Sequence, residues 1–452
     1  MSKVKNSNFF TLNVADAVEA FHKNELTAVD LAKSCVERYK QIEKKVHAWV
    51  YFSENIVLQQ AEKIDKTFKK KKLQHLLTGV PIGIKDIFNT YNMPTCMGSS
   101  IWKGFRPGND ARVVTNLRRE GANIFGKTVT AEFAVHEPGP TLNPYDIKHI
   151  AGTSSTGSAV AVATGMVLAA IGSQTAGSTI RPASYSGVYG YKPSFGCIAR
   201  TGVLKTLDTL DHVTCFVRSV RDLPIMFDAM RVKGMNYPFI FDNFDLIKIK
   251  PKKKWRVAFV KTPVWRNIET YAKENIITWM KSLETIGIKV SFVNLPKEFD
   301  DSHKVHNVIY AKALSYYFKE EYNQHPDQVS NIMKSMIEDG KKINLNLYKE
   351  CVDKQNYLSF RLEEFLSDYD AVLSPSTSGE APLLGKEEKL DPCLIWTLCR
   401  VPSVHLPLFK GPNNLPYGVQ CIARRYNDYL LFIFLNFLRK KRKINDCEIV
   451  NV

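Results

Sequence analysis

Two loops rich in small hydroxyl residues, separated by an uncharged apolar segment, constrain the fold of this chain more than any other feature. The first loop reads Gly152-Thr-Ser-Ser-Thr-Gly-Ser158 and the second reads Gly172-Ser-Gln-Thr-Ala-Gly-Ser178. Flexible linkers do not alternate with segments that must be buried, whereas the walls of an active site do. We therefore expect a buried helix over 158–168 that fixes the separation of the two loops, and a nucleophile within them.

Alternating strand and helix patterns indicate an α/β fold. Short apolar runs typical of strands occur at 79–88, 123–127, 188–192, 202–204, 255–260, 371–375, 404–407 and 418–422. Apolar residues at helical spacing occur at 15–42 (with a break near 23–25 and Thr27 as N-cap), 113–120, 275–286 and 305–318. No internal repeat is visible. The alternation predicts a mixed β-sheet covered by helices.

A length of 452 residues is compatible with one large domain or with several. We expect a single α/β domain over 1–452. Its parts are a helical segment (about 1–75), a catalytic core (76–230), a variable helical insert (232–365) and closing strands with a helix (366–440). Lys, Pro and aromatic residues are enriched over 236–254, which predicts a surface excursion there.

The net charge of +17 is compatible with a nucleic acid, an anionic membrane or an acidic protein as partner. However, the basic residues form short runs, such as 69–72, 252–254 and 439–443. No zinc spacing, aromatic RNA-binding signature or coiled-coil basic region accompanies them. A lysine-rich solvated surface is therefore the favoured interpretation, and no nucleic-acid partner is required.

The nine cysteines occur singly and without a C-x-x-C pair, which indicates free thiols in a reducing compartment. Residues 1–14 lack an apolar core of signal-peptide length. The late apolar run 429–435 is too short to span a bilayer. It favours a helix packed on the core over peripheral contact with a membrane. We expect a cytoplasmic protein, and the sequence leaves a homo-oligomer open.

Ser178 and Lys85 are candidates for nucleophile and base. Small residues before Ser178 allow several backbone N–H groups to converge on one oxygen, as an oxyanion hole requires. A serine in that place needs a base within reach, and none of the ten histidines lies in a serine-hydrolase motif. Lys85 follows an apolar run, where burial would lower its pKa and free the amine near neutral pH.

These residues resemble the amidase signature family. Its three motifs occur in order, as Gly83-Ile-Lys-Asp86 followed by the two hydroxyl loops. Further segments fall in the family's order: Gly126-Lys-Thr, Glu132-Phe-Ala134, Asn143-Pro-Tyr145, Gly190-Tyr-Lys-Pro193, Leu210-Asp-His-Val213 and Leu415-Pro-Tyr-Gly-Val-Gln420. The resemblance extends over about 26–431, which is nearly the whole chain.

The resemblance implies hydrolysis of a small-molecule amide by a Ser–Ser–Lys triad on one mixed α/β domain. Ser178 would be the nucleophile, Ser154 the bridging serine held through a cis peptide, and Lys85 the general base. The oxyanion would be held by four consecutive backbone N–H groups, those of Thr175, Ala176, Gly177 and Ser178. Neither a metal nor an organic cofactor is needed in this family.

The chain departs from the family pattern at a few positions. Thr153, Thr156 and Ala176 stand where glycine is usual, and Gln174 stands where many members carry Asp. Arg181 follows the expected nucleophile by three residues rather than two. The features at Gln174 and Arg181 favour a stand-alone amidase.

Two alternatives remain open. One is the ammonia-supplying glutaminase subunit of a tRNA-dependent amidotransferase, and the other is a non-catalytic scaffold or binding protein of the same fold. The intact Lys85, Ser154 and Ser178 argue against the scaffold. Specificity is expected to be set by 232–359 and by the loop 374–391. No substrate-binding residue can be assigned, although Glu380 and Arg400 are candidates for a pocket wall.

Overall fold

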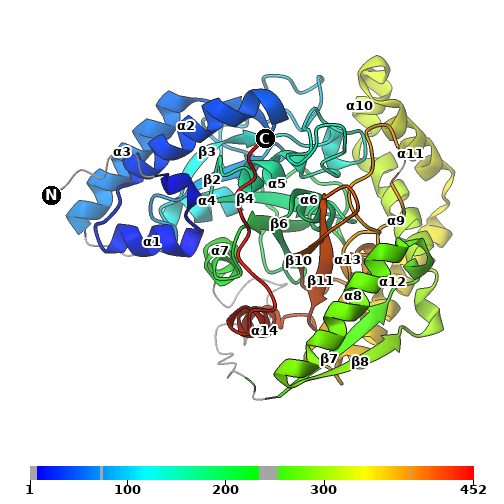
Figure 1. Ribbon diagram of the computed structural model, residues 1–452. Coiled ribbons are helices and arrows are strands. Elements are labelled where there is room, and N and C mark those ends of the chain that lie inside the picture. Colours follow the sequence, from blue (N-terminus) through cyan, green and yellow to red (C-terminus); the bar gives the residue numbers. More distant parts are fainter. Residues whose placement is uncertain (1–7, 72–74, 234–251, 253, 387) are drawn as a thin grey trace.

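The chain folds around one large mixed sheet. The computed structural model describes residues 8–71, 75–233, 252, 254–386 and 388–452 (Figure 1). Within them an 11-stranded sheet has the order β1-β3-β2-β4-β6-β5-β10-β11-β9-β7-β8. The strands in that order are Trp49–Phe52, Asn123–Thr128, Pro81–Lys85, Ala169–Gln174, His212–Val217, Tyr189–Lys192, Ser403–Lys410, Pro416–Ile422, Ala371–Pro375, Trp255–Lys261 and Ile288–Asn294. The predicted single α/β domain with a mixed sheet is confirmed.

Parallel pairing is confined to two regions of the sheet. β2 pairs in parallel with β3 and β4, and β7 pairs in parallel with β8 and β9. The other neighbouring strands are antiparallel. The carboxyl ends of β2 and β4 therefore lie side by side, at the third and fourth positions of the sheet order.

Helices cover both faces of the sheet. They are α1 (Val14–His22), α2 (Ala28–Val46), α3 (Glu54–Lys71), α4 (Arg112–Arg119), α5 (Thr156–Ala163), α6 (Ile180–Ser186), α7 (Asp222–Met230), α8 (Thr270–Ser282), α9 (Ser302–Tyr317), α10 (Lys319–Gln324), α11 (Asn331–Lys342), α12 (Leu345–Leu366), α13 (Leu394–Leu398) and α14 (Asp428–Lys440). The N-terminal helices α1–α3 lie at one end of the molecule and α9–α12 at the other (Figure 1). The predicted break near residues 23–25 is confirmed, and Thr27 caps α2 through a capping box with Asp30.

The C-terminal helix packs on the protein core, as expected. α14 buries Leu431, Phe432, Phe434, Leu435 and Leu438. Among the described residues, no helix is both long and apolar enough to cross a membrane.

The expectation of one buried helix over 158–168 is wrong. α5 ends at Ala163, and Gly165 then adopts a φ of 76°, which a side chain would disfavour. The chain re-enters the sheet as β4, which leads directly into the second hydroxyl loop. Because this apolar segment is buried on every side, its sequence carries no period that separates helix from strand. A helix followed by a central strand therefore spaces the two loops.

Other elements also differ from expectation. Residues 202–204 do not form the expected strand. A single antiparallel β-bridge pairs Val203 with Phe88. β1, β6 and β8 were not predicted. The surface excursion expected at 236–254 lies almost entirely outside the described residues.

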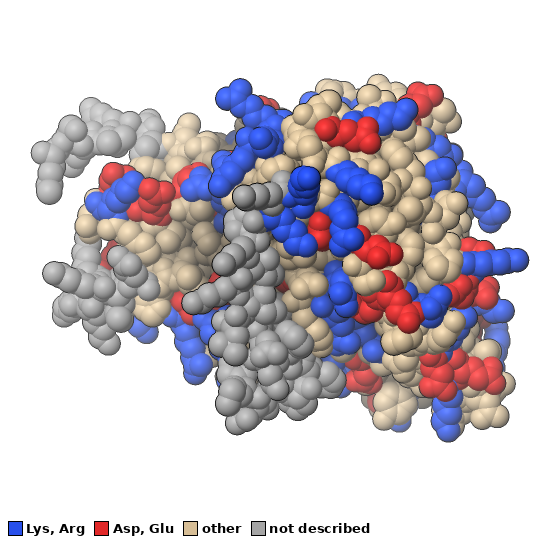
Figure 2. Space-filling view, turned by 90° about the horizontal axis from the view of Figure 1, so that it is seen from below, with Lys and Arg blue, Asp and Glu red and all other residues tan. Residues whose placement is uncertain are grey.

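Basic and acidic side chains are mixed on one face of the molecule (Figure 2). On the face shown in Figure 2, Lys and Arg side chains alternate with Asp and Glu. Several form exposed ion pairs, such as Lys342 with Asp339 and Arg424 with Glu363. This distribution fits a solvated surface of mixed charge.

Candidate active site

Lys85 is fully buried at the carboxyl end of β2 and contacts three serine hydroxyls. Its Nζ lies 2.7 Å from Ser154 Oγ, 2.9 Å from Ser155 Oγ and 2.8 Å from Ser173 Oγ. Ser173 comes from the end of the neighbouring parallel strand β4, whereas Ser154 and Ser155 precede α5. The adjacent ends of two parallel strands thus bring Lys85 to both hydroxyl loops.

Lys85 forms no ion pair with any described carboxylate. The other lysine in this part of the sheet, Lys127, is instead paired with Asp86 at 2.9 Å. Burial lowers the pKa of Lys85 well below its ordinary value of 10.5, and the charge of Asp211 opposes this shift only in part. A buried lysine without a counter-ion is therefore available as a neutral amine, which can accept a proton.

The hydrogen bonds around Lys85 leave two hydroxyls that can donate to it. Ser155 Oγ donates to the Ser173 carbonyl at 3.1 Å, so this hydroxyl accepts from Lys85. A neutral amine has two N–H groups and one lone pair. Its lone pair can therefore accept a proton only from Ser154 or Ser173.

The loop that carries Ser154 contains a cis peptide bond between Thr153 and Ser154, as expected from the family resemblance. Ser154 is fully buried, and its carbonyl accepts a hydrogen bond from Ala131 N–H at 3.2 Å. Among the described residues, neither Thr153 nor Thr156 has a positive φ. The threonines therefore occupy these family glycine positions in ordinary backbone conformations.

Ser178 lies beside this loop and is partly exposed. Its carbonyl accepts a hydrogen bond from Ser155 N–H at 3.3 Å, which ties the two loops together. The Ser178 hydroxyl has no hydrogen-bond partner among the described residues. The structure thus places Lys85 and Ser154 in direct contact and joins Ser178 to them through the backbone, without a hydrogen bond between the Ser154 and Ser178 hydroxyls.

In the segment from Thr175 to Ser178 the carbonyl groups are hydrogen-bonded, whereas the N–H groups donate to no other described residue. Its four carbonyl oxygens accept hydrogen bonds, in order, from His306 Nε2 (2.9 Å), Thr397 Oγ1 (2.8 Å), Arg181 N–H (3.0 Å) and Ser155 N–H (3.3 Å). None of its four N–H groups donates to another described residue. Fixed carbonyls with free N–H groups are the arrangement that an oxyanion hole needs.

Gln174 holds the turn that follows β4. Its Oε1 accepts from the N–H groups of Thr179 and Ile180 at 2.8 and 2.9 Å, and its Nε2 donates to Thr397 Oγ1 at 2.9 Å. An amide supplies both an acceptor and a donor here, whereas an ionised Asp can only accept. Gln174 therefore fits a turn that is anchored on both sides.

Replacing Gly177 with alanine is expected to lower kcat/KM by about 100-fold, the usual cost of losing one oxyanion donor. A Cβ at this position would overlap Oδ2 of Asp391 and approach Cys393 Sγ to 3.0 Å, so the segment must shift. Steady-state kinetics with thermal unfolding as control would measure this. Unchanged kinetics in the variant would contradict the assignment of this segment.

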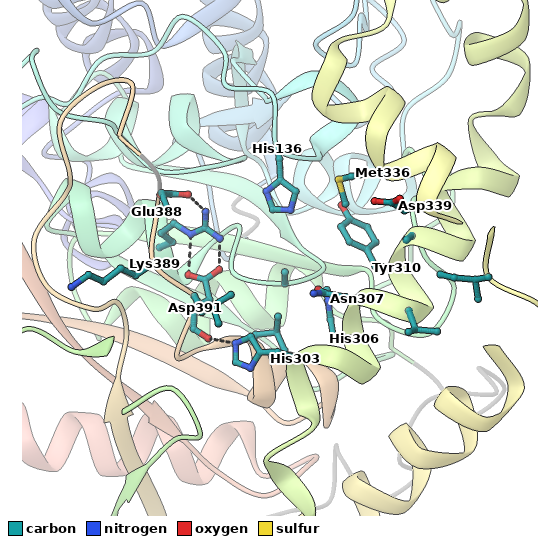
Figure 3. A pocket seen from close by; sticks show the side chains of 17 residues that line it. His136, His303, His306, Asn307, Tyr310, Met336, Asp339, Glu388, Lys389 and Asp391 are labelled. Carbon is teal, nitrogen blue, oxygen red and sulfur yellow. Dashed lines mark hydrogen bonds and ion pairs between the residues drawn. The ribbon is translucent and has the colours of Figure 1, made fainter. Parts of the chain in front are cut away.

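A cavity of about 560 Å³ opens beside this segment (Figure 3). Ala176 and Arg181 line its inner side, and α9, α11 and residues 388–391 form its other walls. The cavity is thus bordered by both segments in which specificity was expected. Glu380 and Arg400, the candidates for a pocket wall, do not line this cavity. Glu380 instead accepts a hydrogen bond from Asn413 N–H, and Arg400 donates one to the Thr209 carbonyl.

The position of Arg181 could not be predicted from the sequence. Its guanidinium is bound to two carboxylates, with Nε 3.0 Å from Asp391 Oδ1 and the terminal nitrogens on Asp391 and Glu388. Asp391 lies 210 residues later in the chain. The spacing of Arg181 from Ser178 was visible in the sequence, but no local signal linked it to these acids.

Comparison with known proteins agrees with the fold. The family model described as Amidase matches residues 30–432. A Mycobacterium bovis protein named as amidase AmiD is 27% identical over 93% of this chain and 92% of its own length. A glutamyl-tRNA(Gln) amidotransferase subunit of Bacillus cytotoxicus is 26% identical over 94% of this chain and 96% of its own length.

A solved structure described as an amidase supports the same fold. It superposes with a TM-score of 0.86 and covers 95% of this chain and 100% of its own, at 24% identity. Together with the family match over most of the sequence, this shows that the chain belongs to the amidase signature family of amide-hydrolysing enzymes.

Proposed function

We propose that this protein hydrolyses the C–N bond of a carboxylic amide through an acyl-enzyme on Ser178, with Ser154 as proton relay and Lys85 as general base. The observation that carries the proposal is Lys85 itself. Lys85 is buried and held against Ser154, and no described carboxylate is its counter-ion. The segment 175–178 has four N–H groups that donate to no other described residue. The substrate is a small-molecule amide, and the free cysteines agree with a cytoplasmic location.

In the acylation step, Ser178 Oγ attacks the amide carbonyl carbon. The Ser178 proton passes to Ser154, while the Ser154 proton passes to the Lys85 amine. The oxyanion is stabilised by the N–H groups of residues 175–178. The C–N bond then breaks as the proton returns from Lys85 through Ser154 to the leaving nitrogen, which departs as ammonia or an amine.

Deacylation uses the same relay, with water in place of Ser178 as the nucleophile. Water attacks the ester carbonyl and gives up a proton through Ser154 to Lys85. The C–Oγ bond breaks, the proton returns to Ser178, and the carboxylic acid is released. In the enzyme without substrate, the Ser178 hydroxyl has no hydrogen-bond partner among the described residues. Catalytic hydrogen bonds that are open in a free enzyme commonly form only with substrate bound.

The proposal is tested by labelling with a fluorophosphonate probe and by a hydrolysis screen over aliphatic, aromatic and ureido amides. We expect covalent labelling that maps to Ser178 and hydrolysis of at least one amide class. A protein that is folded yet neither labelled nor active would support the scaffold alternative instead. The glutaminase alternative rests on relatives named as amidotransferase subunits, and it requires glutamine-dependent ammonia release with a second subunit.

Replacing Ser173 with alanine is expected to reduce kcat by about tenfold and to move the acid limb of the pH–rate profile to lower pH. Ser173 contacts Lys85 but not the expected nucleophile, so it is a positioning residue. Removing its hydroxyl leaves the Lys85 ammonium less solvated, which lowers the pKa of that group further. A variant with reduced kcat and an unmoved acid limb would indicate a purely structural role.

A further inference from the structure

The cavity beside the nucleophile loop indicates which amides this site accepts, an inference that rests on the proposed function. Its volume of about 560 Å³ lies within the range of pockets that enclose drug-sized ligands. The second cavity, which borders Ser173 and Thr175, holds only about 30 Å³. The larger substituent of the substrate therefore occupies the first cavity.

The only arginine that lines this cavity, within the described residues, is already paired with two carboxylates. Arg181 is 6% exposed and is bound by both Asp391 and Glu388. Its guanidinium therefore lies between the two carboxylates. A substrate carboxylate would have to displace one of them and would then meet the negative charge of the other, which disfavours its binding.

The other basic side chains of the lining add no free positive charge. The ammonium of Lys389 is paired with Glu269 and points away from the cavity in Figure 3. Burial lowers the pKa of His306 to about 4, and its Nε2 bonds to the Thr175 carbonyl. Burial also lowers the pKa of His303, whose Nε2 bonds to the Asp391 carbonyl.

His136 completes the set of histidines. It is exposed to the cavity, and its pKa is lowered by the protein atoms around it and by the charge of Arg181. His303 and His306 are therefore neutral near neutral pH, and the charge of Arg181 disfavours protonation of His136.

Negative and apolar groups dominate what remains of the lining. Asp339 of α11 lies across the cavity from Glu388 in Figure 3, and its one ion-pair partner among the described residues is the exposed Lys342. Met336, Ile343 and Leu394 supply apolar walls. The cavity thus combines these apolar walls with an acidic rim, formed by Asp339 and Glu388.

We propose that this cavity binds the acyl group of an amide that is largely apolar and is either uncharged or positively charged at its far end. Acyl groups that carry a carboxylate, including that of glutamine, are excluded. An amine at the far end would be attracted to Asp339, whereas an anion finds no unpaired cation in the described lining.

Primary amides of similar length provide the test, because the leaving group is then ammonia and only the acyl end varies. Octanamide, 7-aminoheptanamide, the monoamide of pimelic acid and glutamine would be compared by ammonia release with the full-length protein. We expect kcat/KM for the neutral and cationic amides to exceed that for both carboxylate-bearing amides by at least about tenfold, which corresponds to ~1.4 kcal/mol.

A matched pair of variants tests the role of the acidic rim. Asp339→Asn is expected to lower the ratio of kcat/KM for 7-aminoheptanamide over octanamide by about threefold. Asp353→Asn removes an equivalent exposed charge from α12 and should leave that ratio unchanged. An unchanged ratio in Asp339→Asn, or an equal fall in both variants, would overturn the assignment of Asp339.

The outcomes separate this inference from the function on which it rests. Efficient hydrolysis of glutamine or the pimelic monoamide, with normal labelling of Ser178, overturns only the proposed substrate class. Labelling of Ser178 without hydrolysis of octanamide or 7-aminoheptanamide also overturns only that class. Absence of both labelling and hydrolysis overturns the proposed function and the substrate class together.

Discussion

Replacing Ser178 with alanine is expected to lower kcat for amide hydrolysis by about 10⁶-fold, close to the loss found when the nucleophile of a serine protease is removed. The variant keeps the N–H groups of the oxyanion segment and the Lys85–Ser154 contact, but it has no atom that can form the acyl-enzyme. Some acceleration over water therefore remains from binding and from the oxyanion hole. Steady-state kinetics and loss of fluorophosphonate labelling would measure the effect.

The same substitution should leave stability nearly unchanged, and this separates a catalytic role from a structural one. Ser178 is partly exposed, and its hydroxyl has no hydrogen-bond partner among the described residues. Its removal should therefore change the free energy of unfolding by no more than about 0.5 kcal/mol. Ser367→Ala, at the exposed end of α12, is the matched control for both measurements. Full activity in Ser178→Ala would refute the proposed nucleophile.

Local sequence carried most of the information about the candidate site. The two hydroxyl loops and the lone Lys85 were visible as motifs because each consists of contiguous residues whose types are unusual in an apolar setting. The strand that carries Lys85 could be predicted from a short apolar run bounded by Gly and Pro, whereas β4 could not. The neighbouring parallel positions of β2 and β4 then explain why motifs far apart in the sequence meet.

Two kinds of feature could not be predicted from the sequence. The division of the central apolar segment into α5 and β4 left no periodic signal, because both elements are buried on all sides. The cavity beside the second hydroxyl loop could not be predicted for a different reason. Its walls are formed by Arg181 with acids more than 200 residues later and by histidines of α9, and such long-range contacts leave no local pattern.

Replacing Lys85 with methionine is expected to lower kcat by about 10⁴-fold, the upper end of what general acid–base catalysis contributes. Methionine has a similar length and no proton to exchange, so it removes the base while filling most of the space. Lys85→Arg should be equally inactive, because a guanidinium does not release its proton in a protein. Near-normal turnover by the methionine variant at neutral pH would exclude Lys85 as the base.

The pH dependence of stability gives a second, independent test of the neutral amine. Burial lowers the pKa of Lys85 in the folded protein well below 10.5, so between these two pKa values the unfolded chain binds more protons than the folded one. Stability therefore rises with pH in that window, by at most about 1.4 kcal/mol per pH unit, and Lys85 penalises folding increasingly as pH falls. Lys85→Met has no amine at this position, so its free energy of unfolding lacks this pH-dependent contribution. The free energy of unfolding of the wild type should consequently drop relative to that of the variant as pH is lowered from about 10, until the folded-state pKa of Lys85 is reached.

Parallel urea titrations of the wild type and Lys85→Met over this pH range would measure the difference in stability. A stability difference that stays constant with pH would mean that Lys85 remains charged in the folded state, and Lys85 could not then accept the proton of Ser154 at neutral pH.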